Sequence, residues 1–203
     1  GHANYLTAAE EVYNVSLDAA DAGTVLTDTT ATAGTATTVT DTGSTFVTDG
    51  IAAGDIVLNS TQHDYGYVVS ATETQVTVIC WTYGTIPVAG DDIRVVTPAS
   101  TGAAVIELTG LDGSYNATSD FIVLNGVADV KASTLFLRIF TITVLLAGSV
   151  GSNVGAINVE DATSTTLIAQ VAVGMNEAEM AMWTVPAGYA LYLTSFYASE
   201  NAG

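Results

Sequence analysis

Short stretches in which polar and apolar residues alternate make up most of this chain. They are rich in Val, Ile, Thr and Tyr, and Gly, Asn, Asp or Pro interrupts them roughly every eight to twelve residues. The crossover helices of a parallel α/β fold are missing, so the pattern predicts an all-β protein built as a sandwich or a barrel. Two segments, residues 6–13 and 176–183, also have the spacing of a short helix, although residues 12–17 alternate as a strand does.

The predicted strands fall into two groups. Those between Gly23 and about Val96 are short and favour a small barrel of about five or six strands, whereas those from Ala103 onward are longer and indicate a sandwich. The predicted strands are residues 36–40, 45–48, 55–59, 65–71, 75–81 and 93–96 in the first group, and 104–109, 119–124, 135–146, 156–160, 167–173, 180–185 and 191–199 in the second.

The segment 135–146 differs from the other predicted strands because its only charged residue is Arg138. Apolar residues occupy both alternating sets of positions, so we expect the opposite sheet to cover one face and a neighbouring subunit or domain to cover the other. The corresponding hypothesis is self-association, with a homotrimer as its specific form. The candidate interface residues are Leu135, Leu137, Ile139, Ile142, Val144 and Leu146.

Turn residues punctuate these strands at characteristic places. Residues 108–126 predict a hairpin with a turn at Asp112-Gly113 and an end at Asn125-Gly126. Two near-copies of one motif, Ala-Gly-Asp-Ile-Val at 53–57 and Ala-Gly-Asp-Asp-Ile at 89–93, each place Gly-Asp before an apolar strand. Gly permits a tight corner and Asp can accept hydrogen bonds from nearby N–H groups, so we expect two similar corners.

The charge balance restricts the partners of the chain. Three basic residues stand against 21 acidic ones, for a net charge of −18, which opposes binding to nucleic acid or to an anionic membrane surface. Only 12% of residues are charged and 49% are hydrophobic, so a folded protein is expected. The 203 residues allow one large or two small β domains. We expect no signal peptide or spanning helix, and Gly1-His2 are treated as a cloning remnant.

Residue types that carry chemistry are sparse or scattered. Cys80 is the single cysteine, which excludes an internal disulfide, and its apolar neighbours predict a buried, inert thiol. His63 lies in a polar segment that predicts a solvated turn. A Gly-x-Ser-x-Gly motif is absent, and no pair of carboxylates stands out among the 21 acidic residues. We therefore expect no enzyme activity, no catalytic residue and no organic cofactor.

Calcium is the metal that the residue types favour, because hard oxygen ligands are plentiful. Asp112, Ser114 and Asn116 alternate across the hairpin turn, and Asp18 and Asp21 lie near the start of the chain. The full EF-hand pattern is absent, so an ordinary surface turn is the simpler interpretation of Asp112, Ser114 and Asn116.

Four aromatic residues are candidates for stacking against a sugar. Trp81 and Tyr83 share strand parity near Gly84, and Tyr65 and Tyr67 share parity in an earlier predicted strand. A core position is the alternative for each, and burial of Trp81 would dismiss the glycan interpretation.

Several motifs in a fixed order resemble a module of predicted virion structural proteins from tailed phages, especially marine ones. They cover about half of the chain and lie at residues 5–10, 110–116, 124–126, 136–139, 151–155 and 184–188. In that family the first motif normally leads within a couple of dozen residues to the hairpin. Here a long segment intervenes, and its sequence at residues 46–57 and 90–94 resembles a different phage module.

The resemblance implies a jelly-roll-like β-sandwich formed by residues 1–22 and 98–203, with a small β-barrel domain inserted at 23–97. Loop tips tolerate such insertions when the two ends lie close together. The insert distinguishes this chain from shorter members of the family.

The function implied by the resemblance is that of a non-catalytic virion structural protein. Such a decoration, fibre or head-associated component of the capsid or tail would lie on the particle surface and contact other virion proteins and copies of itself. One alternative is a glycan-binding, adhesin-like module. Another is a subunit of an extracellular filament joined by donated strands, which fails if residues 3–17 pair within their own chain.

Overall fold

The computed structural model describes residues 6, 8–98, 101–163, 166–180, 190, 192 and 194. Every strand pairing in this part of the chain is antiparallel and none of its residues is helical, which confirms the all-β prediction. No described segment forms a helix long and apolar enough to cross a membrane. The strands are β1 Tyr13–Ser16, β2 Gly23–Thr30, β3 Ala33–Thr35, β4 Thr38–Thr40, β5 Ile56–Asn59, β6 Asp64–Ala71, β7 Gln75–Val78, β8 Asp92–Pro98, β9 Ala103–Leu111, β10 Ala117–Val123, β11 Val130–Lys131, β12 Arg138–Ala147, β13 Ile157–Glu160, β14 Leu167–Val171 and β15 Glu177–Glu179.

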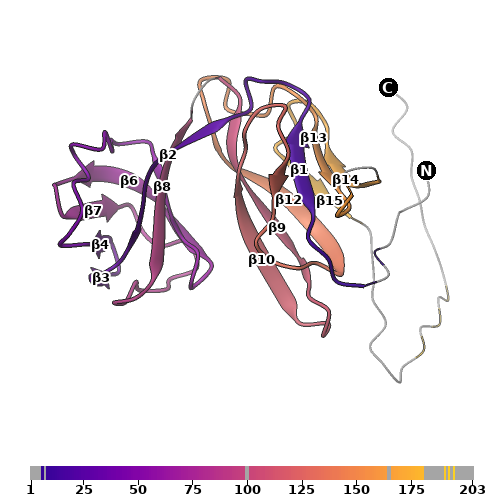
Figure 1. Cartoon of the computed structure of the whole chain (residues 1–203), viewed down its shortest axis with the longest axis horizontal. Helices are drawn as coiled ribbons and strands as arrows, with labels where there is room; N and C mark the ends of the chain where they lie inside the picture. The colour runs from indigo at the N-terminus through magenta and orange to yellow at the C-terminus, as the bar shows by residue number, and fades with distance from the viewer. Residues whose placement is uncertain are drawn as a thin grey trace.

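The strands form three sheets (Figure 1). Sheet 1 has the order β11-β1-β13-β14, and sheet 2 has the order β10-β9-β12-β15. Sheet 3 has seven strands in the order β2-β8-β5-β6-β7-β4-β3. Strands β2 to β8 therefore form one sheet, while β1 and the strands after β8 form the other two. The division into an outer domain and an inserted domain stays a prediction.

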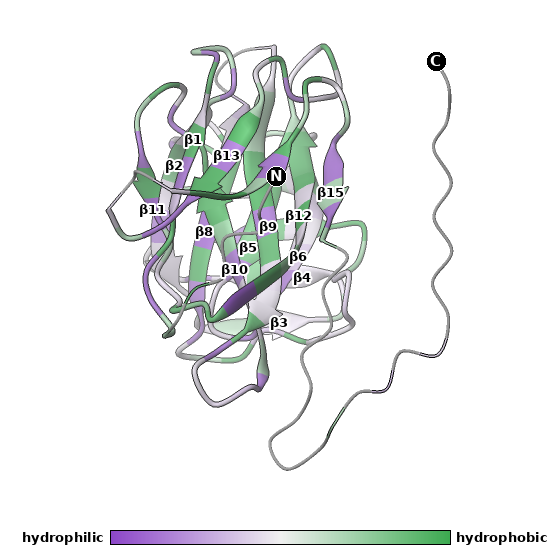
Figure 2. Ribbon diagram, turned by 90° about the vertical axis from the view of Figure 1, so that its right-hand side faces the viewer, coloured by the Kyte–Doolittle hydropathy of each residue, from purple (hydrophilic) through white to green (hydrophobic). Residues whose placement is uncertain are grey.

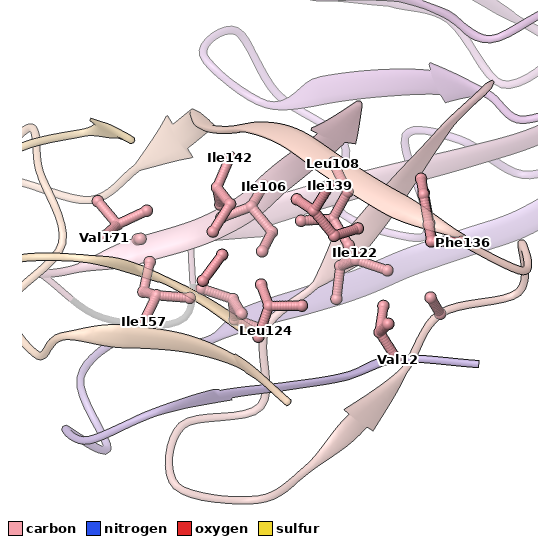
Figure 3. Close-up of a cluster of buried hydrophobic side chains, with 14 of the residues drawn as sticks. Val12, Ile106, Leu108, Ile122, Leu124, Phe136, Ile139, Ile142, Ile157 and Val171 are labelled. Atoms are coloured by element: carbon pink, nitrogen blue, oxygen red, sulfur yellow. The ribbon is translucent and has the colours of Figure 1, made fainter. Parts of the chain in front are cut away.

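Sheets 1 and 2 pack face to face as a β-sandwich. Val12, Ile157 and Val171 lie on one side of the core, and Ile106, Leu108 and Ile142 lie on the other (Figure 3). Residues two positions apart in a strand share a face, so the alternation in β9 and β13 places their apolar side chains in this core. Figure 2 shows the hydrophobic residues along the strands and the polar β15 at an edge of sheet 2.

Sheet 3 curves around a second core that contains Val39, Phe46, Val76 and Trp81. The two Gly-Asp corners in this sheet have the predicted conformation. Gly54 and Gly90 have φ of 101° and 99°. The Asp55 carboxylate accepts a hydrogen bond from the N–H of Ala52 at 2.8 Å, and the Asp91 carboxylate accepts one from the N–H of Val88 at 3.0 Å.

Closure of sheet 3 into a barrel stays a prediction. Strands β2 and β3 form its two edges, and no described strand pairing joins them. The chain passes from one edge to the other through Ala31 and Thr32, with the N–H of Ala31 donating to the carbonyl of Asp91 at 2.8 Å. This connection holds the edges near each other without ladder hydrogen bonds between them.

Some of the predicted elements were wrong. Residues 45–48 form a turn that buries Phe46, and β2 lies in a segment without clear alternation because it is an edge strand with few buried positions. The helical spacing of 176–183 is misleading where it is described, since residues 177–179 form β15. In 6–13, likewise, the described residues are not helical and Tyr13 begins β1. The predicted strands 180–185 and 191–199 lie almost entirely outside the described residues.

The second face of sheet 2 packs against sheet 3. Phe121, Val105 and Leu145 from sheet 2 meet Ile56 and Leu58 from β5 in a third apolar cluster. The apolar residues at both parities of segment 135–146 are explained by this arrangement, since the chain itself covers both faces of sheet 2.

The candidate subunit interface on this segment is therefore corrected. Ile139 and Ile142 are fully buried in the sandwich core, Val144 packs against that core, and Leu146 belongs to the cluster between sheets 2 and 3. Leu137 is also buried, and Leu135 alone of the six is substantially exposed, at 48%. These side chains are occupied by intramolecular packing, so the strand offers no continuous apolar face to another subunit.

A buried carboxylate joins three stretches of the chain where the sandwich meets sheet 3. Asp21 accepts hydrogen bonds from the hydroxyl of Ser16 at 2.6 Å and from the N–H groups of Ala103 at 2.7 Å, Val154 at 2.8 Å and Gly155 at 2.7 Å. A methyl group added to Gly102 would lie 2.1 Å from the Asp21 Oδ1, so glycine is required for this close approach. The carboxylate thereby fixes the ends of β1, β9 and the 148–155 loop.

Replacing Asp21 by Asn should strongly destabilise the protein. The amide keeps one acceptor oxygen but points N–H groups at N–H donors, so the loss should be about 2–4 kcal/mol of unfolding free energy. Urea denaturation measures this difference. Asp18→Asn is the matched control, because the Asp18 carboxylate accepts one described hydrogen bond, from the N–H of Ala20 at 2.8 Å. Equal losses in the two variants would contradict the role assigned to Asp21.

Candidate functional site

An open hollow of roughly 400 Å³ lies where sheet 3 meets the outer face of sheet 2. We call it the junction hollow. Sheet 2 contributes residues from β9 and β10, of which Glu107, Thr109 and Ser119 have the strand parity that faces away from the sandwich core, and two loops of sheet 3 contribute the remainder. Its lining residues are His63, Tyr83, Glu107, Thr109, Ala117, Thr118 and Ser119.

The loop that carries Tyr83 is held by the buried carboxylate of Asp64. This carboxylate accepts hydrogen bonds from the N–H groups of Tyr83 at 2.9 Å and Thr85 at 2.8 Å. His63 precedes Asp64 and has a left-handed backbone with φ of 51°. The exposed turn predicted for His63 is confirmed, and it places the imidazole at the rim of the hollow.

Two tyrosine hydroxyl groups connect sheet 3 to sheet 2. The Tyr83 hydroxyl donates to the Glu107 carboxylate, with distances of 3.0 and 3.3 Å to its two oxygens. The Tyr67 hydroxyl donates to the carbonyl of Leu145 at 2.7 Å. Between them, the ring of Tyr65 makes edge contacts with Tyr67, Tyr83 and Phe121 at centroid distances of 5.9, 5.9 and 6.0 Å. The tyrosines therefore form a rigid wall of the junction.

Glu107 is the principal titratable group of the hollow. Its side chain is buried, with 6% of the residue exposed. Burial raises the pKa of this carboxyl, the hydrogen bond from Tyr83 lowers it, and the charge of Asp64 raises it. As a net result, the pKa of Glu107 lies above the ordinary glutamate value of 4.5. Burial and the charge of Glu107 also raise the pKa of the Tyr83 phenol. A carboxylate in a concave site with such a perturbed pKa marks a candidate binding site.

Glu107 was not identified from the sequence as a candidate. It interrupts the apolar segment Ala-Ala-Val-Ile-Glu-Leu at 103–108, which is the signal that could have found it. The significance of this glutamate depends on Tyr83 and His63, which reach the same place from loops distant in sequence.

The four aromatic candidates do not form one exposed platform. Trp81 is only 4% exposed and donates its indole N–H to the carbonyl of Thr35 at 3.1 Å, so it belongs to the core of sheet 3. Tyr65 is half-buried between neighbouring rings. Tyr83 and Tyr67 keep exposed fractions of 58% and 37%. Trp81 is therefore excluded as a sugar-stacking residue.

The turn with Asp112, Ser114 and Asn116 uses its carboxylate internally. Asp112 accepts hydrogen bonds from the N–H groups of Ser114 at 2.8 Å and Asn116 at 2.9 Å, and from the Asn116 amide at 3.2 Å. Tyr115 has a left-handed backbone here with φ of 64°, and the turn extends from 112 to 116. Within the described ranges, no group of three or more His, Cys, Asp or Glu side chains could hold a metal ion. Calcium binding at this turn stays a prediction.

Strand β1 lies inside its own sheet and pairs with β11 and β13. Tyr13 is opposite Glu160, and Ser16 is opposite Ile157. Residues 13–16 are therefore not available for donation to a neighbouring subunit, which removes the premise of the filament alternative for this segment.

Comparisons with protein-family models, with curated proteins and with solved structures each find no match to this chain.

The prediction of a buried Cys80 was wrong, because this thiol is exposed. Strand β7 ends at Val78, so the alternation that would bury Cys80 does not continue, and Ile79 is exposed beside it. We expect one equivalent of thiol to react with Ellman's reagent in the native protein without denaturant. Cys80→Ser should abolish the signal, and a thiol that reacts only after unfolding would contradict the exposed position.

The pH dependence of stability should report on Glu107. Its carboxyl binds a proton more tightly in the folded chain than in the unfolded chain, because the folded pKa is raised. Its contribution to stability is therefore full below the unfolded pKa and is lost as pH rises through the folded pKa. Glu107→Gln keeps a neutral side chain, so its stability relative to the wild type, measured by urea denaturation, should increase as pH rises from the unfolded glutamate pKa of about 4.3 through the raised folded pKa.

Tyr83→Phe should move this pH window upward, because the hydrogen bond from Tyr83 lowers the pKa of Glu107. Tyr67→Phe is the matched control, since it removes a tyrosine hydroxyl that bonds to a backbone carbonyl. The interpretation fails if the stability difference between Glu107→Gln and the wild type does not change with pH.

Proposed function

We propose that this chain is a non-catalytic virion structural protein, an accessory component of a capsid or tail at the particle surface. The sequence resemblance supports this role. The observation that carries the proposal is the use of buried acidic side chains as hydrogen-bond acceptors for loops. Asp21, Asp64 and Asp91 each accept three or more hydrogen bonds from other residues of the chain.

These carboxylates contribute to rigidity rather than to reaction chemistry. The Asp120 carboxylate follows the same pattern, because it accepts hydrogen bonds from the N–H groups of Ser133 at 2.6 Å and Thr134 at 2.9 Å. Hydrogen bonds to charged acceptors are stronger than neutral ones, so each such residue limits the motion of a loop. Fixed loops on a β scaffold favour a role in assembly, where the shape of a surface has to be maintained.

The junction between sheets 2 and 3 supports the same proposal. Apolar packing and two tyrosine hydrogen bonds hold sheets 2 and 3 together, so the two parts of the molecule present their surfaces in a fixed arrangement. The net charge of −18 limits nonspecific association with nucleic acid and with anionic surfaces. Contacts with other virion proteins and with copies of itself are part of the proposal.

The glycan-binding alternative is not favoured, because the burial of Trp81 meets the condition that dismisses it, although Tyr83 and Tyr67 remain partly exposed. A filament subunit is less well supported because β1 already pairs within its own chain.

The location of the chain on a particle tests the proposed function. Phage particles from a host that produces this protein would be purified on a density gradient, and antibodies against the purified chain would be applied with a gold label. We expect electron microscopy to show the label at a regular position on the capsid or tail. Antibodies against a cytoplasmic host protein serve as the control, and a chain found only in the particle-free fraction would contradict the proposal.

A further inference from the structure

We propose that the junction hollow binds a guanidinium group, presented by an arginine side chain on the surface of a different protein. This inference goes beyond the proposed function and does not require it, because the binding can be measured with the isolated chain.

Among the described residues, no ion pair joins the Glu107 carboxylate of the hollow to a basic side chain. The described ion pairs are Arg94 with Asp28 and Lys131 with Glu11, so neither involves Glu107. The Glu107 carboxylate instead receives one phenolic hydrogen bond from Tyr83. A carboxylate can accept about four hydrogen bonds, which leaves acceptor capacity for a cation that enters the hollow.

The other lining groups favour guanidinium over a compact ammonium ion. Guanidinium is planar, can donate two parallel hydrogen bonds to a carboxylate and can stack on an aromatic ring. Tyr83 supplies a ring beside the carboxylate, and Thr109 and its cross-strand partner Ser119 supply hydroxyl oxygens that can accept the remaining N–H groups. The Thr109 hydroxyl is held by that of Thr141 at 2.6 Å, so its position is fixed.

The charge of the whole chain indicates where the arginine comes from. A net charge of −18 favours a basic partner over a second, equally acidic copy as the occupant of the hollow. The chain has only three basic residues, and Arg94 and Lys131 already pair with carboxylates of their own molecule. The hollow is open to solvent and has a volume of roughly 400 Å³, so it can admit a side chain that remains attached to a protein surface. A basic surface of a different protein is therefore the occupant we assign.

The titratable groups around the hollow give the binding a direction with pH. Glu107 faces the hollow from β9, His63 from its turn and Tyr83 from its loop, and Asp64 lies behind the tyrosines with its carboxylate bound to backbone N–H groups. Protonation of Glu107 removes the attracting charge, so binding should weaken as pH falls.

Isothermal titration calorimetry with a capped tripeptide, acetyl-Gly-Arg-Gly-amide, tests the inference at low salt and neutral pH. The same tripeptide with citrulline in place of arginine is the matched probe, because citrulline has similar shape without the charge. We expect the citrulline peptide to bind at least about tenfold more weakly, as expected for loss of a charge-assisted hydrogen bond. Glu107→Gln should weaken arginine-peptide binding by a similar factor.

Asp129→Asn is the control variant, because it also removes one negative charge but alters an exposed residue outside the hollow. It should change the affinity by less than about twofold. A cooperative thermal transition establishes that Glu107→Gln is folded, and if it is not, the two peptides compared on the wild-type chain still decide the question.

Several results would overturn the inference. One is equal binding of the arginine and citrulline peptides, or no binding of either peptide. Another is equal weakening by Glu107→Gln and Asp129→Asn. Binding of free arginine without binding of the capped peptide would indicate a small-molecule site instead, and saturation by a neutral methyl glycoside with no response to the arginine peptide would indicate a glycan site.

Discussion

The Asp21 carboxylate accepts hydrogen bonds from residues that are far apart in sequence but meet where the sandwich adjoins sheet 3. An ionised side chain is costly to bury unless donors surround it, and here the donors come from β1, from the start of β9 and from the 148–155 loop. The sandwich and the entry into sheet 3 therefore depend on one another. A Cβ at Gly102 would meet the carboxylate itself, and one at Gly155 would meet Asp18 and the Ser16 hydroxyl, so the backbone around the carboxylate has room only for glycine at these two positions.

Sheet 2 is the layer that the other two sheets share. Ile106 and Leu108 face sheet 1, whereas Val105 and Glu107 face sheet 3. The alternating side chains of β9 therefore pack against sheet 1 on one face and sheet 3 on the other. The single glutamate among these apolar positions, Glu107, lies where the face toward sheet 3 borders the hollow. A charged residue at this place replaces apolar packing that the junction would otherwise gain, which is consistent with selection for binding at the expense of stability.

Local patterns predicted much of the fold because they depend on neighbouring residues. The Gly-Asp corners at 54–55 and 90–91 follow from backbone freedom and a nearby carboxylate, and the hairpin of β9 and β10 follows from alternation around a polar turn. The exposure of Cys80 could not be predicted in this way, because the end of β7 at Val78 is set by tertiary pairing. Phe46 is similar, since an apolar residue in a turn is buried only through the sheet that closes over it.

The candidate site was predicted only in part, through Tyr83 and the exposed turn at His63. Glu107 gains its significance from segments brought together by the whole fold. The apolar residues on both faces of strand 138–147 fit either a subunit interface or a second sheet of the same chain, and sheet 3 covers the second face. Periodicity indicates how many faces of a strand are covered, but it does not tell whether the cover comes from the same chain or from another one.

The register of β2 against β8 places Gly23 opposite Pro98, so the chain enters and leaves sheet 3 side by side. A short link could therefore replace the segment between these two residues, because joining ends that lie side by side has little entropic cost. Its removal would nevertheless uncover Phe121, Val105 and Leu145 to water. The connectivity alone would therefore permit loss of this segment, whereas the apolar packing between sheets 2 and 3 opposes it.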